Sequence, residues 1–254
     1  MMAIEKSAVL PEHNFLQQMV IRSLKTAYRT LTTTQAFTIE VRNRALGALE
    51  GVFDLQMTET LWAKVRKLVL ALSPKMEQSG FWSGWLLYLQ RALQMSREFF
   101  DKQAEGKISM QIGIFQQRQG QLDKAREWFH ESIECAKETD DTLLWATTLN
   151  QLGFMASMQH KPTEASAYVN QALELMSDSD LQQEYSYFIL GNVSLSLNEP
   201  QTATNYFQKS IHICQQHKNQ TQIASRYNSL GNSLTAQGMY YEALDVYVNA
   251  MKLW

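Results

Sequence analysis

An apolar residue followed by glycine recurs four times between residues 112 and 231 of this 254-residue chain, and this recurrence constrains the fold more than any other feature. The glycines are Gly113, Gly153, Gly191 and Gly231, and the interval between consecutive members is nearly constant. A regular period of about 40 residues is typical of an array of repeated structural units, each packed on its neighbours.

Three further columns of residues accompany each glycine. Twelve positions after the glycines come the alanines Ala125, Ala165, Ala203 and Ala243. Four positions later come the bulky residues Phe129, Val169, Phe207 and Tyr247. Small residues follow three positions after these, at Ser132, Ala172, Ser210 and Ala250. Small side chains let two helices approach closely while the bulky residue fills the space beside them, so each unit is predicted to be two helices joined by a turn.

Turn signals lie between the two predicted helices of each unit. Gly120 and Gly238 provide them in the first and fourth units, and the segments 160–162 and 198–200 end in proline in the second and third. Glycine suits the end of a helix, and proline suits the first turn of the next one.

These columns resemble the motif of the tetratricopeptide repeat (TPR) family, which has a shorter period of about 34 residues. The longer repeats are similar to the TPR arrays of bacterial STAND signalling ATPases and of kinesin light chains. The resemblance covers residues 106–254 and implies an all-α, right-handed superhelical solenoid of antiparallel helix pairs, with about twelve helices in the whole chain. It also implies a bacterial protein that works by binding another protein.

A degenerate repeat is predicted upstream, over residues 56–105. Ser73 lies one period before Gly113 and takes the glycine position, and Gly80 marks the turn. The segment GFWSGWLLYLQRAL, with Trp82 and Trp85, resembles the first unit of the STAND-associated arrays. The two tryptophans are predicted to seal the junction with the preceding helices, the alternative being a recognition patch. Residues 1–55 are predicted to form an N-terminal helical cap.

Composition excludes several classes of partner. The net charge of −2 provides no overall field for nucleic acid, although residues 1–75 carry ten Lys/Arg against six Asp/Glu. The sequence has no uninterrupted apolar run long enough to span a bilayer, so no membrane partner is expected. Cys135 and Cys214 lie too far apart in the sequence for a metal-binding pattern and are predicted to be reduced, buried thiols of a cytoplasmic protein.

No catalytic constellation stands out, and the chain is predicted not to be an enzyme. A glycine-rich phosphate loop is missing from the sequence. Cys214 with His217, and His130 with Glu134, could each share a helix face, but neither pair has a third ligand for a metal or an orienting group for a nucleophile. We therefore expect no cofactor and no metal.

A partner is predicted to bind where the first helices of the pairs line a concave groove. Counting from each glycine, the predicted partner-binding residues are Met110, Ile114, Gln117, Arg118, Asn150, Phe154, Phe188, Asn192, Asn228 and Asn232. The asparagines could donate to and accept from a peptide backbone at once, and the apolar side chains could form pockets.

Three hypotheses for function remain open. The first is a scaffold that binds a partner protein or peptide in the groove. The second is a peptide- or ligand-sensing module of a larger signalling ATPase or protease system, and the third, less favoured, is an enzyme. No polar capping helix follows Met251, so the chain is either a fragment of a longer array or a protein that self-associates through its open C-terminal repeat.

Overall fold

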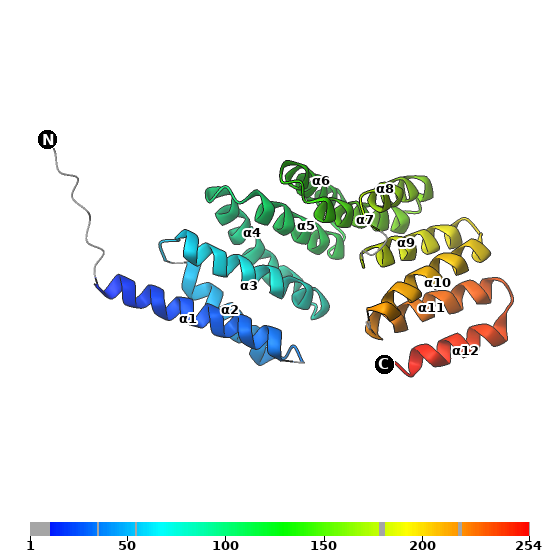
Figure 1. Ribbon diagram of the computed structural model, residues 1–254, viewed down its shortest axis with the longest axis horizontal. Coiled ribbons are helices and arrows are strands. Elements are labelled where there is room, and N and C mark those ends of the chain that lie inside the picture. Colours follow the sequence, from blue (N-terminus) through cyan, green and yellow to red (C-terminus); the bar gives the residue numbers. More distant parts are fainter. Residues whose placement is uncertain (1–10, 35, 54, 178–180, 218–219, 254) are drawn as a thin grey trace. The chain divides into compact units, whose positions relative to one another are not determined.

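The computed structural model describes residues 11–34, 36–53, 55–177, 181–217 and 220–253. Over these residues the chain contains helices and no strands (Figure 1). The helices are α1 (Pro11–Thr33), α2 (Ile39–Phe53), α3 (Glu59–Gln78), α4 (Trp82–Glu98), α5 (Lys102–Arg118), α6 (Leu122–Glu138), α7 (Thr142–Met158), α8 (Pro162–Glu174), α9 (Gln183–Ser196), α10 (Pro200–Gln216), α11 (Gln220–Ala236) and α12 (Tyr240–Met251). The predicted all-α class is confirmed.

Two compact units make up the chain, Met1–Gln119 (unit 1) and Gly120–Trp254 (unit 2). The predicted division at residues 55 and 105 into a cap, a degenerate repeat and four full repeats stays a prediction, and residues 1–10 of the cap lie outside the described residues. The boundary at residue 105 falls inside α5, so the helix that follows the degenerate repeat begins at Lys102.

The columns of small and bulky residues form the helix crossings in unit 2. A Cβ atom added to Gly153 would lie 2.6 Å from Cγ2 of Val169, and one added to Gly191 would overlap the ring of Phe207. Ala165, Ala203, Val169 and Phe207 are fully buried at these crossings. As predicted, the bulky residue packs directly against the glycine. This contact allows the close approach of α7 to α8 and of α9 to α10.

Residues with positive φ mark the turns within the helix pairs. They are Gly80, Gly120, His160, Asn198 and Gly238, and their φ angles run from 56° to 77°. All five lie in the turn segments that the sequence indicated. His160 and Asn198 adopt the left-handed conformation without being glycine, which costs about 1 kcal/mol or more for most residues and less for asparagine.

The degenerate repeat of unit 1 uses a different crossing. Trp85 is fully buried, and its indole N–H donates a 3.2 Å hydrogen bond to Oγ of Ser73, the residue in the glycine position. Burial of Trp85 favours the predicted sealing role over an exposed recognition patch. Leu49 of α2, Leu68 of α3 and Leu89 of α4 are also fully buried in this unit.

Candidate partner-binding site

A row of aromatic rings runs along the first helices α7 and α9 of unit 2. The ring centroids of Phe154 and Tyr185 are 5.8 Å apart, and those of Tyr185 and Phe188 are 5.9 Å apart. All three side chains are half-buried, so one part of each ring packs on the core while another part remains accessible. Tyr185 and Phe188 lie three residues apart, which places them on one face of α9. We call Phe154, Tyr185 and Phe188 the aromatic row.

A buried ion pair supports the aromatic row from α11. Arg226 of α11 pairs with Glu184 of α9, and their side chains are only 8% and 3% exposed. The guanidinium carbon of Arg226 lies 3.8 Å from the ring centroid of Phe188, which is within the range of a cation–π contact. Ser210 of α10 donates a 2.7 Å hydrogen bond to the Glu184 carboxylate. This network ties α9, α10 and α11 together beneath the row, and the sequence analysis missed it.

Cys214 lies beside the same network and is not an activated nucleophile. The side chain is fully buried, and burial together with the neighbouring Glu184 carboxylate raises the pKa of the thiol to about 12. A nucleophilic cysteine needs a thiolate and access to substrate. The alternative that paired Cys214 with His217 therefore has no support from the geometry.

Asn150 is placed differently from what the sequence indicated. Its side chain is 1% exposed. Nδ2 donates to Oγ of Ser186 at 2.8 Å, and that hydroxyl donates back to Oδ1 at 3.0 Å. Both amide atoms of Asn150 are thus engaged with Ser186, and the buried side chain joins α7 to α9.

The other predicted residues of unit 2 remain accessible to different degrees. Asn192 is half-buried on α9, and Asn228 and Asn232 are exposed on α11. Oδ1 of Asn232 accepts a 2.7 Å hydrogen bond from the Tyr247 hydroxyl of α12. Asn192 lies four residues after Phe188 on the same face of α9, and the exposed Asn228 is available to a partner on α11.

The predicted residues of unit 1 all lie on α5. Ile114 is buried at 7% exposure, and its predicted contact with a partner stays a prediction. Met110 and Gln117 are half-buried. Arg118 is exposed, and its guanidinium pairs with the Glu77 carboxylate of α3 at 2.7 Å.

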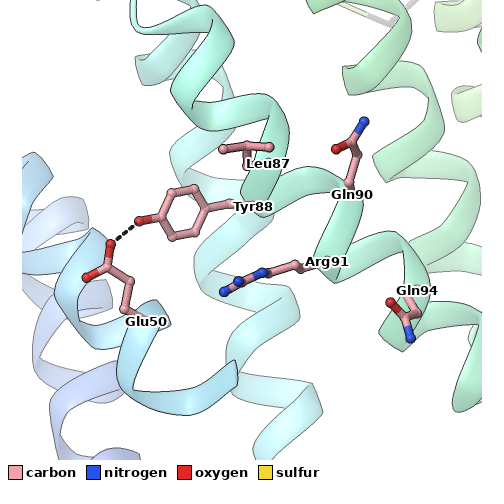
Figure 2. Close-up of a pocket in the computed structure, with 6 residues that line it drawn as sticks. All are labelled: Glu50, Leu87, Tyr88, Gln90, Arg91 and Gln94. Carbon is pink, nitrogen blue, oxygen red and sulfur yellow. Dashed lines mark hydrogen bonds between the residues drawn. The ribbon is translucent and has the colours of Figure 1, made fainter. Parts of the chain in front are cut away.

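A cavity of about 440 Å³ opens between α2 and α4 of unit 1 (Figure 2). Its lining residues are Glu50, Leu87, Tyr88, Gln90, Arg91 and Gln94. The Tyr88 hydroxyl donates a hydrogen bond to Glu50, and burial together with this bond raises the pKa of Tyr88 to about 12. No sequence pattern pointed to this cavity, because α2 lies in the predicted cap, which has no repeat columns.

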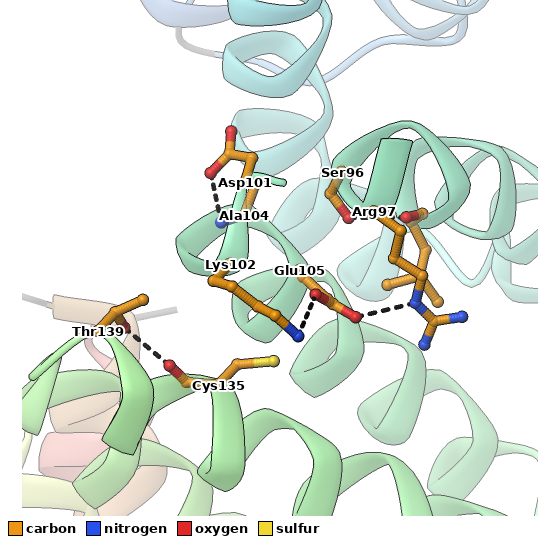
Figure 3. A network of polar contacts seen from close by, with 9 residues as sticks. Ser96, Arg97, Asp101, Lys102, Ala104, Glu105, Cys135 and Thr139 are labelled. Carbon is orange, nitrogen blue, oxygen red and sulfur yellow. Dashed lines mark hydrogen bonds and ion pairs between the residues drawn. The ribbon is translucent and has the colours of Figure 1, made fainter. Parts of the chain in front are cut away.

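Polar contacts fix the turn between α4 and α5 (Figure 3). Asp101 caps α5 by accepting from the Ala104 N–H at 3.0 Å, and its carboxylate also accepts from Trp62 and Arg66 of α3. Glu105 pairs with Arg97 at 2.9 Å and with Lys102 at 3.0 Å. Burial acts to raise the pKa of Asp101 and of Glu105, but these donors outweigh it and hold both values below their usual range.

Apolar side chains are exposed along α12. They are Tyr240, Tyr241, Leu244, Val248 and Met251, with Leu244 at 59% exposure. Most of them repeat at three- or four-residue spacing, which forms an apolar stripe on one side of the helix.

The described residues lack two features of metal-binding and membrane-spanning proteins. Over the described part of the chain, no group of three or more His, Cys, Asp or Glu side chains is arranged to hold a metal ion. Within the same residues, no helix combines the length and the apolar character needed to cross a membrane.

Comparison with known proteins finds two family matches and one curated relative. Residues 105–178 match the tetratricopeptide repeat family, and residues 150–232 match the family of anaphase-promoting complex subunit 5. The transcriptional activator NprA of Geobacillus stearothermophilus is 26% identical over 149 residues, which cover 51% of this chain and 37% of that protein. The chain therefore spans well under half the length of the curated relative that it matches.

Solved structures share the fold at low identity. The apo form of RapI has a TM-score of 0.63 at 15% identity and covers 95% of this chain and 97% of its own. A Rap protein complexed with Competence and Sporulation Factor has a TM-score of 0.62 at 14% identity, with coverage of 93% and 66%. The apo form of the quorum sensor NprR from B. thuringiensis has a TM-score of 0.58 at 16% identity, with coverage of 98% and 82%. This likeness shows the fold, which is an all-helical, TPR-like solenoid.

Proposed function

We propose that this chain is a protein-binding repeat module. Its working surface is formed by α7, α9 and α11, the first helices of the helix pairs in unit 2, and we call this surface the first-helix face of unit 2. The observation that carries the proposal is the aromatic row, in which Phe154, Tyr185 and Phe188 are half-exposed and held in place by the buried pair of Glu184 and Arg226. Aromatic rings that are only partly buried offer a large apolar contact at little cost in side-chain entropy.

The flanking side chains favour a peptide or a protein segment as the ligand. Asn192 and Asn228 each provide an amide that can donate to and accept from a main chain. Among the structural neighbours, one Rap protein is complexed with Competence and Sporulation Factor, and NprR is a quorum sensor. These neighbours support a signal-binding role for the same fold.

A pull-down from a native lysate with matched variants tests this surface. The variant Asn192→Arg/Asn228→Arg adds bulk and charge beside the aromatic row. The control Asn170→Arg/Asn205→Arg makes the same change at exposed asparagines of the second helices α8 and α10. We expect the control to retain the captured protein and the first variant to lose it, with circular dichroism showing that both are folded. Equal capture by both variants would place the contact elsewhere.

A sensing module within a larger regulator is the second candidate, favoured by the match to the transcriptional activator NprA over 37% of its length. The predicted link to a signalling ATPase stays a prediction. Small-angle scattering separates sensor from scaffold, since a sensor should change its scattering profile when the captured ligand is added. An unchanged profile at saturating ligand would favour the scaffold.

Three further inferences accompany the proposal. We infer that the chain is not an enzyme, because the Cys214 thiol is buried and its raised pKa disfavours a thiolate nucleophile. We also infer that it works in the cytoplasm, where buried thiols such as Cys135 and Cys214 stay reduced. Self-association through the apolar stripe of α12 stays a prediction. Sedimentation analysis should show a dimer or larger species that Leu244→Glu disrupts, and a monomeric wild type would contradict it.

A further inference from the structure

A second groove lies between α1 and α3 in unit 1, where the two helices run side by side (Figure 1). It encloses about 290 Å³ and is lined by Leu24, Lys25, Tyr28, Ala63, Lys64 and Lys67. Leu24 is buried at the helix contact, and the Lys67 ammonium lies 4.6 Å from the centroid of the Tyr28 ring. The groove thus combines apolar walls with amino groups contributed by both helices. We call it the lysine groove.

The lysine groove carries an excess of positive charge among the described residues. None of its lining residues is acidic, and within the described residues none of Lys25, Lys64 and Lys67 forms an ion pair. Arg22 and Arg29 stand three residues before and four after Lys25, so that α1 adds two more cations on the same side. Like charges gathered in this way repel one another, which makes a bound anionic partner favourable.

We propose that the lysine groove docks an acidic segment of a partner protein. Carboxylates of the segment would pair with the ammonium groups of Lys25, Lys64 and Lys67, and an apolar side chain would pack against Leu24 and Tyr28. A protein segment fits better than nucleic acid, because the cations surround a short apolar groove between two helices instead of following a phosphate backbone. This surface is chemically distinct from the aromatic row of unit 2 and does not depend on it.

Fluorescence anisotropy tests the proposal with a short labelled peptide that is rich in Glu and Asp and contains one Leu and one Phe. The full chain should bind this peptide. It should bind the version with Gln and Asn in place of the acids at least about tenfold more weakly, since the three ion pairs with Lys25, Lys64 and Lys67 are lost. The variant Lys25→Glu/Lys64→Glu/Lys67→Glu should lose binding by a similar factor. The control Lys124→Glu/Lys137→Glu/Lys252→Glu makes the same change in net charge at exposed lysines of unit 2 and should bind as the wild type does.

Two safeguards keep this test decisive. Lys64 is half-buried, so Lys25→Gln/Lys64→Gln/Lys67→Gln serves as a milder variant, with folding checked by circular dichroism. Equal binding of the acidic peptide by the wild type and the groove variants would overturn the proposal, as would no binding by the wild type. Duplex DNA is the competing probe, and DNA that binds more tightly than the peptide and depends on the same three lysines would also overturn it.

Discussion

Unit 1 and unit 2 are built from the same antiparallel helix pairs but present different chemistry on their first helices. In unit 2 these helices carry the aromatic row, two accessible asparagines and a buried ion pair. In unit 1 they carry the lysine groove, and residues 1–119 hold 15 Lys/Arg against 10 Asp/Glu, whereas residues 120–254 hold 8 against 15. Packing at the helix crossings constrains which residues can occupy the small and bulky positions. The solvent-exposed helix faces are not constrained in this way, so their side chains can differ between the units and suit different partners.

Removal of one partner of the buried pair in unit 2 should give the largest effect. Arg226→Met leaves the Glu184 carboxylate buried without its cation, and we expect a loss of about 3–5 kcal/mol in the free energy of unfolding. In unit 1, Arg44→Met removes an exposed pair with Glu40 and should cost less than about 1 kcal/mol. Urea denaturation measures both.

The double variant Glu184→Leu/Arg226→Met sharpens this comparison, because it removes the unpaired charge and should recover most of the loss. If Arg226→Met cost no more than Arg44→Met, unit 2 would not depend on its buried pair as described.

Gly191→Ala in unit 2 should have the next largest effect. The new methyl group would overlap the buried Phe207 ring, and the forced shift should cost about 1–3 kcal/mol. In unit 1, Gly47→Ala on α2 meets nothing within 4 Å and should stabilise the helix by up to about 1 kcal/mol. Opposite signs in thermal or urea unfolding are expected, and equal shifts would contradict the crossing described for unit 2.

His160→Gly should stabilise unit 2 by about 1 kcal/mol, because glycine adopts the left-handed conformation of this turn without strain. Asn198→Gly should gain less, since asparagine tolerates the same conformation better. The neighbouring Gln159→Gly, at a φ of −83°, is the control and should give no gain. In unit 1 the corresponding turn before α4 already has glycine, at Gly80. A loss of stability in His160→Gly would show that His160 is held by contacts that the turn geometry does not reveal.

Acidification should have the smallest effect on the free energy of unfolding, and this effect should arise mainly in unit 1. The pKa values of Asp101 and Glu105 in unit 1 are lowered in the folded chain, as is that of Glu164 in unit 2, where the hydrogen bond from Arg126 is the main cause. Lowered values mean that these carboxylates stabilise the fold above their unfolded pKa of about 4 and that this stability is lost as the pH falls below it.

Unfolding measured between about pH 7 and about pH 3 checks the acid effect. Asp101→Asn should flatten the pH dependence more than the exposed Glu134→Gln does. A profile left unchanged by Asp101→Asn would show that the turn between α4 and α5 does not carry the effect.

The repeat pattern was sufficient to predict the helix pairs, the turns and the crossings. The roles of Gly153, Gly191 and the turn residues His160 and Asn198 could be predicted from the repeat alone. The same steric requirement recurs at the same position of every unit. Asn150 shows where this reasoning stops. Counting from Gly153 places Asn150 in the groove. In the structure its amide instead donates a hydrogen bond to Ser186, 36 residues away, at the contact between α7 and α9.

The charged features escaped prediction for a related reason. Glu184 and Arg226 lie 42 residues apart, and no spacing rule marks two charged residues as buried partners. The lysine groove depends on the pairing of α1 with α3, which lie in the predicted cap and the degenerate repeat, where the columns are missing or weak. Only the excess of basic residues over positions 1–75 hinted at it.

Site-specific photo-crosslinking tests the central claim, that the first-helix face of unit 2 holds the partner, most directly. A photoreactive amino acid placed at Asn228 of α11 samples this face, and the same residue placed at Asn205 of α10 samples an exposed second helix. The account predicts a covalent adduct with the captured partner from position 228 and none from position 205. An adduct from position 205 alone would contradict it.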